Sequence, residues 1–465
     1  MTLPQRRAAG AMAQAIPARI SARPARSAPK GLALQRFIAG WAAFGVTLSG
    51  ATQLRMAGLP AGPAELILAA WVGFVVFLVL RGVRFAGGRV AVILGTYWLC
   101  ALTFMGLGAL VAVQTRRMEL GAAAHDGMAF VYMGVLSTFL ALRLFDQDTY
   151  RYHWHFARLN FLFHAAVAGV LLGVAMIAPQ LGPLRLWYGG IRFSGWSENP
   201  NQMALAMAAM PFLGWWQLRR TPGRFGKTIC GLGIALCVAA GFATLSDGLR
   251  AGWLASLGVI GGLLFYRTTM RGRSKWLYIS HVMIPALVLI LGTLLGGDMI
   301  DRIYRAAQDI YAEGDQGEKR FTLWSHGLAA IRVSPLFGFG PGPFSGYGGP
   351  FEGWEAHNSF IDWGMSTGVA GVLLYAVLLG WIGWRAFRSH EMTLIGMWVS
   401  VVVVSFFGYV LRQPDFWTAM VLVLVLSEIP LAVRAQQGSP AAPPGAPARQ
   451  LRPARAPPVR PIRTR

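Results

Sequence analysis

Charged residues are scarce in this chain, and their scarcity limits the classes of protein to which it can belong. Only 13% of the 465 residues are charged, whereas 55% are hydrophobic and the mean hydropathy is +0.48. A soluble domain is usually about one-quarter charged. Apolar runs of about 20 residues recur, each long enough to cross a bilayer. Because these runs do not alternate as barrel strands do, the sequence predicts an all-α polytopic membrane protein.

Cysteine is also rare, and its placement speaks against a disulfide framework. Cys100, Cys230 and Cys237 fall inside apolar runs, where they resemble small core hydrophobes. The histidines show no metal-ligand spacing with carboxylates, and there is no P-loop, dinucleotide-binding glycine motif or nucleophile elbow. We therefore expect no metal and no cofactor.

Acidic residues are missing before Glu65, and the basic N-terminal region has two readings. Residues 1–31 are rich in Arg, Ala and Pro, as a disordered cytoplasmic tail or a transit peptide would be; we favour the tail. Residues 435–465 form a second Pro/Ala/Arg-rich segment, predicted to be a disordered cytoplasmic tail. Residues 32–434 form the predicted membrane domain.

The apolar runs predict about twelve transmembrane helices and an orientation. The spans are near 37–53, 64–80, 90–112, 127–145, 157–178, 200–217, 228–245, 251–266, 277–297, 359–381, 392–411 and 415–433. With both termini inside, the inner segments hold 29 Lys and Arg residues and the outer ones 12. This asymmetry favours cytoplasmic termini, and it explains the net charge of +23 better than nucleic-acid binding does.

One predicted outer connection is much longer than the others. Residues 298–358 hold eight of the nineteen acids, and the stretch "SPLFGFGPGPFSGYGGP" is dense in Gly and Pro. Loops of this length are usually functional or disordered. Apolar residues near helical spacing over 303–333 predict one or two amphipathic helices, so we expect a small outer subdomain over 298–358.

Polar residues in the predicted outer loop before residue 200 form the first candidate site. In "IRFSGWSENPNQMA", Arg192 precedes Asn199 and Asn201, which flank a proline. Asn and Pro at these positions predict a capped helix N-terminus, which can hold an anion. A capped helix beside a solvated Arg192 is the structural alternative.

Two further arginines lie on the same predicted side. Arg250 lies at the apolar boundary of a span, where a cation must snorkel, pair or face a polar cavity, and Asp247 is a candidate partner. Arg320 and Trp324 are four residues apart on one predicted helix face. An arginine on an amphipathic helix is usually solvated, which is the structural alternative for Arg320.

The stretch "AHNSFIDWGMSTGVAG" places His357 and Asn358 at the mouth of a predicted span. A side chain with a near-neutral pKa is suited to take a proton from a hydroxyl, although an interfacial histidine would also fit there. Asn358 would cap the helix or orient the ring. Gly364, Gly368 and Gly371 follow as a stripe that we interpret as helix packing.

These motifs together resemble the lipopolysaccharide O-antigen ligase family, which includes polysaccharide polymerases. The resemblance rests on "RFSG" with "NPN", "SDGLRAGW", "RFTLW", "SPLFGFGPG", and His-Asn followed after nine residues by Gly-x-x-Gly. It covers roughly residues 185–380. Each motif alone is weak, but their order and spacing are specific to the superfamily.

The resemblance implies a C-class membrane glycosyltransferase fold in the bacterial inner membrane, with its active site facing the periplasm. It implies a glycan donor on undecaprenyl diphosphate, and lipid A-core or a growing polysaccharide as acceptor, without metal or nucleotide. By position, His357 would be the base, and Arg192, Arg250 and Arg320 would hold the donor diphosphate. We also assign Arg250 to the catalytic residues, with support from Asn199, Asn201, Asn358 and Trp324.

The chemistry of the residues agrees with a basic site. A diphosphate leaving group gains negative charge as the glycosidic bond breaks, and fixed guanidinium groups stabilise that charge. A glycoside hydrolase would need two paired carboxylates, but Asp301, Asp315, Glu318 and Glu355 are scattered. We favour a ligase over a polymerase. A lipid-linked glycan transporter or flippase is the alternative from another class, although the chain lacks the internal repeats of many transporters.

Overall fold

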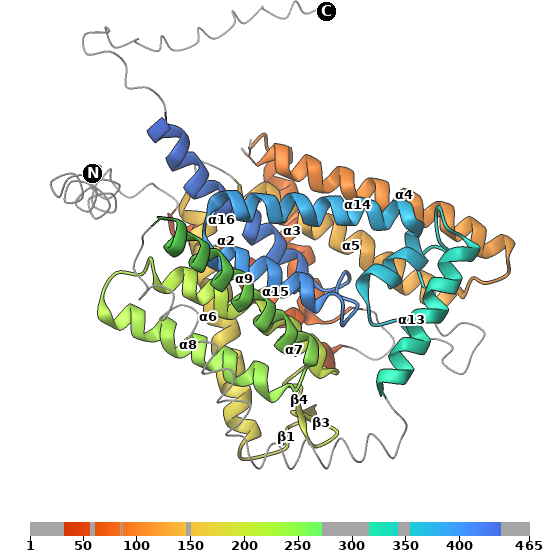
Figure 1. The fold of residues 1–465 in the computed structure, drawn as a ribbon, viewed down its shortest axis with the longest axis horizontal. Helices are drawn as coiled ribbons and strands as arrows, with labels where there is room; N and C mark the ends of the chain where they lie inside the picture. The colour runs from red at the N-terminus through yellow and green to blue at the C-terminus, as the bar shows by residue number, and fades with distance from the viewer. Residues whose placement is uncertain are drawn as a thin grey trace, which may run out of the picture.

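The computed structural model describes residues 32–55, 61–83, 85, 87–145, 150–271, 316–342 and 354–438. This part of the chain forms a bundle of helices (Figure 1). The helices are α2 (Leu32–Ser49), α3 (Pro63–Leu80), α4 (Gly88–Gln114), α5 (Leu120–Leu144), α6 (Tyr150–Ala175), α7 (Pro200–Leu218), α8 (Arg224–Ala243), α9 (Asp247–Arg271), α13 (Gln316–Val333), α14 (Ser359–Ser389), α15 (Met392–Val404) and α16 (Pro414–Gly438), with the short 3₁₀ helix η1 (Thr52–Leu54) after α2.

The helices confirm the all-α polytopic prediction. Within the described residues, seven are long and apolar enough to cross a membrane, namely α3, α4, α5, α6, α8, α9 and α14. Helices α2, α7, α15 and α16 lie at four further predicted spans. Three predicted features lie wholly or largely outside the described residues. They are the span 277–297, both tails apart from residues 435–438, and much of the 298–358 subdomain.

The structure corrects the predicted ends of two spans. Helix α15 ends at Val404, although the sequence predicted a span to residue 411. Beyond Val404, backbone groups bond to Ser359 and do not form further helix hydrogen bonds. The Ser359 N–H donates to the Ser405 carbonyl over 2.8 Å, and the Val410 N–H donates to Ser359 Oγ over 3.0 Å. Helix α16 continues to Gly438, past the predicted start of the tail at 435.

An aromatic cluster fills the core where α4, α5, α14 and α16 meet. Trp98, Trp363 and Trp417 are buried, and the ring centroids of Trp98 and Trp417 lie 4.8 Å apart. A buried indole N–H needs an acceptor. Trp98 donates to Ser137 Oγ over 2.9 Å, and Trp363 donates to the Gly371 carbonyl over 3.1 Å. These bonds fix the orientation of the rings that support α14.

Segments predicted to share one side of the membrane contact one another. On the predicted outer side, the Gln53 side chain donates to the Arg185 carbonyl over 2.8 Å. On the predicted inner side, Arg220 donates to Glu391 Oε1 over 2.9 Å. These contacts fit the predicted order of inner and outer connections, while the prediction of which side is cytoplasmic rests on the Lys and Arg asymmetry.

Two small antiparallel hairpins connect α6 to α7. The strands are β1 (Gln180–Leu181), β2 (Leu184–Arg185), β3 (Trp187–Tyr188) and β4 (Arg192–Phe193). Gln180 pairs with Arg185 in the first hairpin, and Tyr188 pairs with Arg192 in the second. Phe193 is buried, so its neighbour Arg192 is held at a defined place beside α7.

A break in α14 makes room for the loop that follows α13. Gly368 has φ 68° and ψ −174°, a conformation that favours glycine. The freed backbone pairs with the loop: Val369 N–H donates to the Pro335 carbonyl over 2.8 Å, and Phe339 N–H donates to the Met365 carbonyl over 2.7 Å. The loop backbone therefore replaces part of the helix ladder of α14.

The predicted glycine stripe has three different surroundings. A Cβ at Gly364 would lie 2.7 Å from Ile331 of α13, so a helix does approach there. At Gly368 a Cβ would lie 2.2 Å from the backbone of Leu336, which belongs to a loop. At Gly371 the nearest neighbour is Thr367 of the same helix. The interpretation of the whole stripe as a helix-packing face is therefore correct only at Gly364.

Candidate active site

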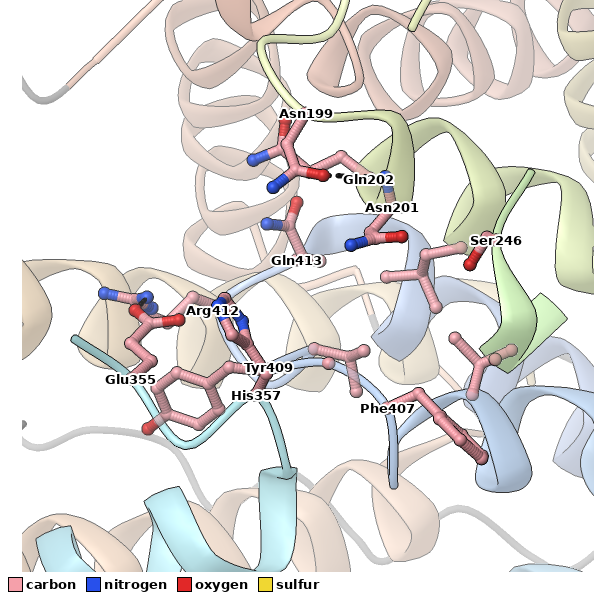
Figure 2. Close-up of a pocket in the computed structure, with 15 residues that line it drawn as sticks. Asn199, Asn201, Gln202, Ser246, Glu355, His357, Phe407, Tyr409, Arg412 and Gln413 are labelled. Atoms are coloured by element: carbon pink, nitrogen blue, oxygen red, sulfur yellow. Dashed lines mark hydrogen bonds and ion pairs between the residues drawn. The ribbon is translucent and has the colours of Figure 1, made fainter. Parts of the chain in front are cut away.

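His357 lies directly before α14, at the wall of a polar pocket (Figure 2). Its φ of 52° is in the left-handed region, which is uncommon for a non-glycine residue. The next residue, Asn358, is the N-cap of α14, and its side-chain oxygen accepts from the N–H of Phe360 over 3.0 Å and of Ile361 over 3.4 Å. Of the two functions predicted for Asn358, the structure supports helix capping.

The backbone on both sides of His357 is held by side chains of other residues. The carboxylate of buried Asp362 accepts from the N–H of Ala356 over 2.8 Å and from the N–H of Asn358 over 3.0 Å. Trp324 Nε1 of α13 donates to the Ala356 carbonyl over 2.9 Å. These three bonds fix the position of the chain that carries the imidazole. Asp362 was not among the predicted site residues.

Arg192 is joined to the start of α7 through a side chain of the pocket. Its Nη2 donates to Asn201 Oδ1 over 2.9 Å, and its Nε donates to the Thr244 carbonyl over 3.1 Å. Asn199 caps α7, since its Oδ1 accepts from the Asn201 N–H over 2.8 Å. The predicted cap at Asn199 is thus present, and Asn201 connects it to Arg192.

Arg250 and Arg320 both lie close enough to Arg192 to affect its guanidinium. Burial lowers the pKa of the Arg192 guanidinium; the charge of Asp247 acts against this effect, and the charges of Arg320 and Arg250 add to it. Arg250 Nη1 lies 3.8 Å from Asp247 Oδ1, the partner that the sequence suggested. The Arg250 Nε is buried and has no hydrogen-bond partner among the described residues. The cluster therefore has unused capacity to bind an anion.

The surroundings of His357 favour its neutral form. Burial lowers the pKa of the imidazole, and the positive charge of Arg320 lowers it further. A neutral ring has a free nitrogen that can accept a proton. Arg320 thus links the arginine cluster, by proximity, to the predicted base.

The pocket beside His357 has a volume of about 120 Å³, which is smaller than a typical ligand pocket and suits a small group such as part of one sugar unit. It is formed by the start of α7, the turn before α9, the chain before α14, and the segment between α15 and α16. Its lining residues are Asn199, Asn201, Gln202, Leu205, Ser246, Gly248, Glu355, His357, Val404, Phe407, Gly408, Tyr409, Val410, Arg412 and Gln413.

The structure brings some of the predicted site residues into this pocket and leaves others beside it. His357, Asn199 and Asn201 line the pocket. The three arginines, Asn358 and Trp324 are not among the lining residues; of these, Arg192 bonds to the pocket residue Asn201, and Trp324 and Asn358 hold the segment that carries His357.

Sequence reasoning missed the contribution of the segment between α15 and α16. Arg412 pairs there with Asp126 of α5 and with Glu355, two residues before His357, and its guanidinium lies 4.8 Å from the centroid of the Tyr409 ring. A usable signal was present, because Arg412 is a cation between two predicted spans. Its partners are distant in sequence and could not be predicted from spacing.

No group of three or more His, Cys, Asp or Glu side chains suitable for a metal is found in the described part of the chain. Of the acids noted in the sequence, Asp301 and Asp315 lie outside the described residues, and Glu355 pairs with Arg412.

Comparison with known proteins gives one family. Residues 232–376 match the family described as O-antigen ligase. This match confirms the resemblance to the O-antigen ligase family that the motifs predicted. A search of curated proteins gives no match.

The matched region covers less than half of the chain but contains much of the candidate site. Arg250, Arg320 and His357 lie within residues 232–376. Arg192 and Arg412 lie outside this region and come next to it only in the folded bundle. The O-antigen ligase family is of the glycosyltransferase type, and this polytopic membrane protein is similar to that family over residues 232–376.

Proposed function

We propose that the protein moves a glycan from undecaprenyl diphosphate to a sugar hydroxyl of lipid A-core, at the periplasmic face of the inner membrane. The observation that carries this proposal is that His357 lines the same pocket as Asn201, which accepts a hydrogen bond from Arg192. Arg320 lies close enough to influence both His357 and Arg192, and Arg250 also influences Arg192. A group that can accept a proton thus lies in the same electrostatic neighbourhood as cations that can hold a diphosphate.

The reaction would proceed by direct displacement at the anomeric carbon of the donor. A neutral His357 takes the proton from the acceptor hydroxyl, whose oxygen forms the new glycosidic bond. The bond between the anomeric carbon and the phosphate oxygen breaks, and its electron pair leaves with undecaprenyl diphosphate. Arg192, Arg250 and Arg320 stabilise the charge that develops on this leaving group. The proton on His357 then passes to solvent, which restores the neutral ring.

Fixed positions are required for this chemistry, and the bonds around His357 would provide them. Asp362 holds the N–H groups of Ala356 and Asn358, and Trp324 holds the Ala356 carbonyl. A positioned base typically contributes about 10²–10⁴-fold to the rate. Because Asp362 and Trp324 act through the backbone, we regard them as positioning residues.

The proposal can be tested with purified protein and a defined undecaprenyl diphosphate-linked glycan. With lipid A-core as acceptor, His357→Ala should lower the initial transfer rate per folded enzyme by about 10²–10⁴-fold and retain donor binding. His326→Ala is the matched control, since His326 lies on α13 but does not line the pocket. Wild-type turnover in His357→Ala would show that this histidine only begins a helix.

The acceptor is tested in the same assay. Attachment of the glycan to lipid A-core by the wild-type protein supports the ligase assignment. Lengthening of the lipid-linked glycan when lipid A-core is absent would instead assign the protein as a polymerase that uses the same donor class. Movement of the donor across a bilayer without formation of a glycosidic bond would favour a flippase.

A further inference from the structure

We propose that the pocket between α7 and the segment after α15 binds an uncharged sugar unit of the acceptor, through amide groups that donate hydrogen bonds. This inference rests on the proposed transfer reaction and adds the location and chemical class of the acceptor site. Figure 2 shows the amides of Asn199, Asn201, Gln202 and Gln413 grouped on one side of the pocket, with His357 on the other.

Three of these amides have their oxygen atoms occupied by the protein. Asn199 Oδ1 accepts from the Asn201 N–H over 2.8 Å, and Asn201 Oδ1 accepts from Arg192 over 2.9 Å. Gln202 Oε1 accepts from Thr52 Oγ1 over 2.7 Å. Their NH₂ groups have no hydrogen-bond partner among the described residues. Since the oxygen atoms are held, each amide presents a donor whose orientation is already set.

Gln413 adds an amide whose oxygen and nitrogen both lack a hydrogen-bond partner among the described residues. Its backbone N–H donates to the Val410 carbonyl over 3.0 Å, but its side chain makes no hydrogen bond within the described part of the chain. This side chain can therefore both donate and accept. The three fixed amides donate hydrogen bonds, and Gln413 can both donate and accept them. This combination suits the hydroxyl and acetamido groups of a neutral sugar.

The charges at the pocket wall argue against an anionic ligand. Arg412 and Glu355 are the charged residues among those that line it, and they pair with each other. Arg412 also pairs with Asp126, so one guanidinium is opposed by two carboxylates. A phosphate group placed in the pocket would find no free cation among its described lining residues, and it would lie close to Glu355. Anions are instead favoured at the arginine cluster.

The position of His357 assigns this sugar to the acceptor. The sugar of the donor is one bond from the diphosphate, so it must lie at the arginine cluster. None of Arg192, Arg250 and Arg320 lines the pocket, whereas His357 does. A sugar in the pocket would thus present its hydroxyl to the base that the acceptor needs.

Binding can be tested with the purified full-length protein by saturation-transfer difference NMR. The probes are glucose, N-acetylglucosamine and glucose 6-phosphate. The neutral sugars should give signals that are lost in Gln413→Leu and in Gln202→Glu, because the latter keeps an oxygen for Thr52 but removes the donor. Gln114→Leu is the matched control, an exposed glutamine at the end of α4 that does not line the pocket. Glucose 6-phosphate should lose its signal in Arg250→Ala instead.

The kinetic readout separates this inference from the proposed function. In Gln413→Leu the acceptor KM should rise on the order of tenfold, as expected for loss of one or two hydrogen bonds, with the donor KM unchanged. A raised donor KM with an unchanged acceptor KM would assign the pocket to the donor sugar and overturn the inference. Unchanged acceptor KM and unchanged sugar signals would also overturn it while leaving transfer by the wild type intact. If the wild type bound the neutral sugars but showed no transfer, and Gln413→Leu still lost the sugar signals, the proposed function would be contradicted and the sugar site would be retained.

Discussion

Trp324 donates its indole N–H to the Ala356 carbonyl over 2.9 Å, which joins α13 to the residue directly before His357. The bond crosses 32 positions of sequence and is partly buried. It means that a change in α13 can move the predicted base without touching the pocket.

Trp324→Phe should slow transfer while the protein remains folded. The ring is kept, but the Ala356 carbonyl loses its partner, which costs about 1 kcal/mol. We expect kcat to fall about three- to tenfold with little change in either KM. Trp384→Phe is the control, because Trp384 is half-exposed on α14 and is not among the residues that line the pocket. A fall in thermal stability with normal kcat would show that Trp324 serves packing alone.

Arg250→Ala should remove most of the transfer activity. Its buried Nε has no partner among the described residues, so this group is available to a donor phosphate. The expected loss in kcat is on the order of 10²–10³-fold, the size seen when one donor to a developing charge is removed. Arg250→Lys should restore only part, because lysine keeps the charge but lacks the planar fork.

The matched control for Arg250→Ala is Arg332→Ala, an exposed arginine in the last turn of α13. Arg192→Ala and Arg320→Ala should resemble Arg250→Ala if all three hold one diphosphate. Normal transfer by Arg250→Ala at equal expression would remove this residue from the site.

The pH dependence of transfer should report the charge around His357. Burial and then Arg320 lower the pKa of His357, so the active neutral form persists to pH values below the ordinary value of 6.5. The acidic limb of kcat is therefore expected below pH 6.5. Arg320→Gln removes the charge that lowers the pKa of His357 in addition to burial. The acidic limb should therefore move to higher pH, but not all the way to the ordinary value, because burial remains.

The informative quantity in that experiment is the position of the acidic limb, since Arg320→Gln should also slow transfer by weakening donor binding. Profiles of kcat against pH are compared for the wild type, Arg320→Gln and Arg332→Gln as control. A limb that moves downward in Arg320→Gln, or the same limb in all three proteins, would contradict the proximity of Arg320 to the base.

Gly368→Ala should destabilise the protein strongly. A Cβ there would lie 2.2 Å from the carbonyl carbon of Leu336, and the residue has φ 68°. Both steric overlap and backbone strain oppose the substitution, and the combined cost should exceed about 3 kcal/mol. Gly380→Ala on the same helix is the control, since nothing lies within 4 Å of its built Cβ. Equal melting temperatures for these two variants would be incompatible with the described break in α14.

Some features of the site could be predicted because they depend on neighbours in sequence. Asn199 and Asn358 were predicted as helix caps or supports from their positions before a span, and both cap helices. Arg250 was predicted to have Asp247 as a partner at three residues' distance, and the two side chains do approach. Helix caps and pairs of this kind act within one turn, so spacing suffices to find them.

Other features could not be predicted because they depend on contacts between distant segments. Arg412 and Asp126 are 286 positions apart, and no periodicity connects them. The end of α15 at Val404 depends on hydrogen bonds to Ser359, which hydropathy does not record. The apolar run there predicted a longer span than the structure contains.

The sequence by itself determined the class of protein, the approximate positions of the described helices, and the family resemblance, because apolar length, capping residues and local motifs are written along the chain. Only the tertiary structure decided that Gly368 breaks α14, that Arg412 joins Asp126 to Glu355, and that the amides lie opposite His357. The physical reason is that burial and hydrogen bonding act between whichever groups the packed helices bring together. Those pairings exist only after the bundle has formed.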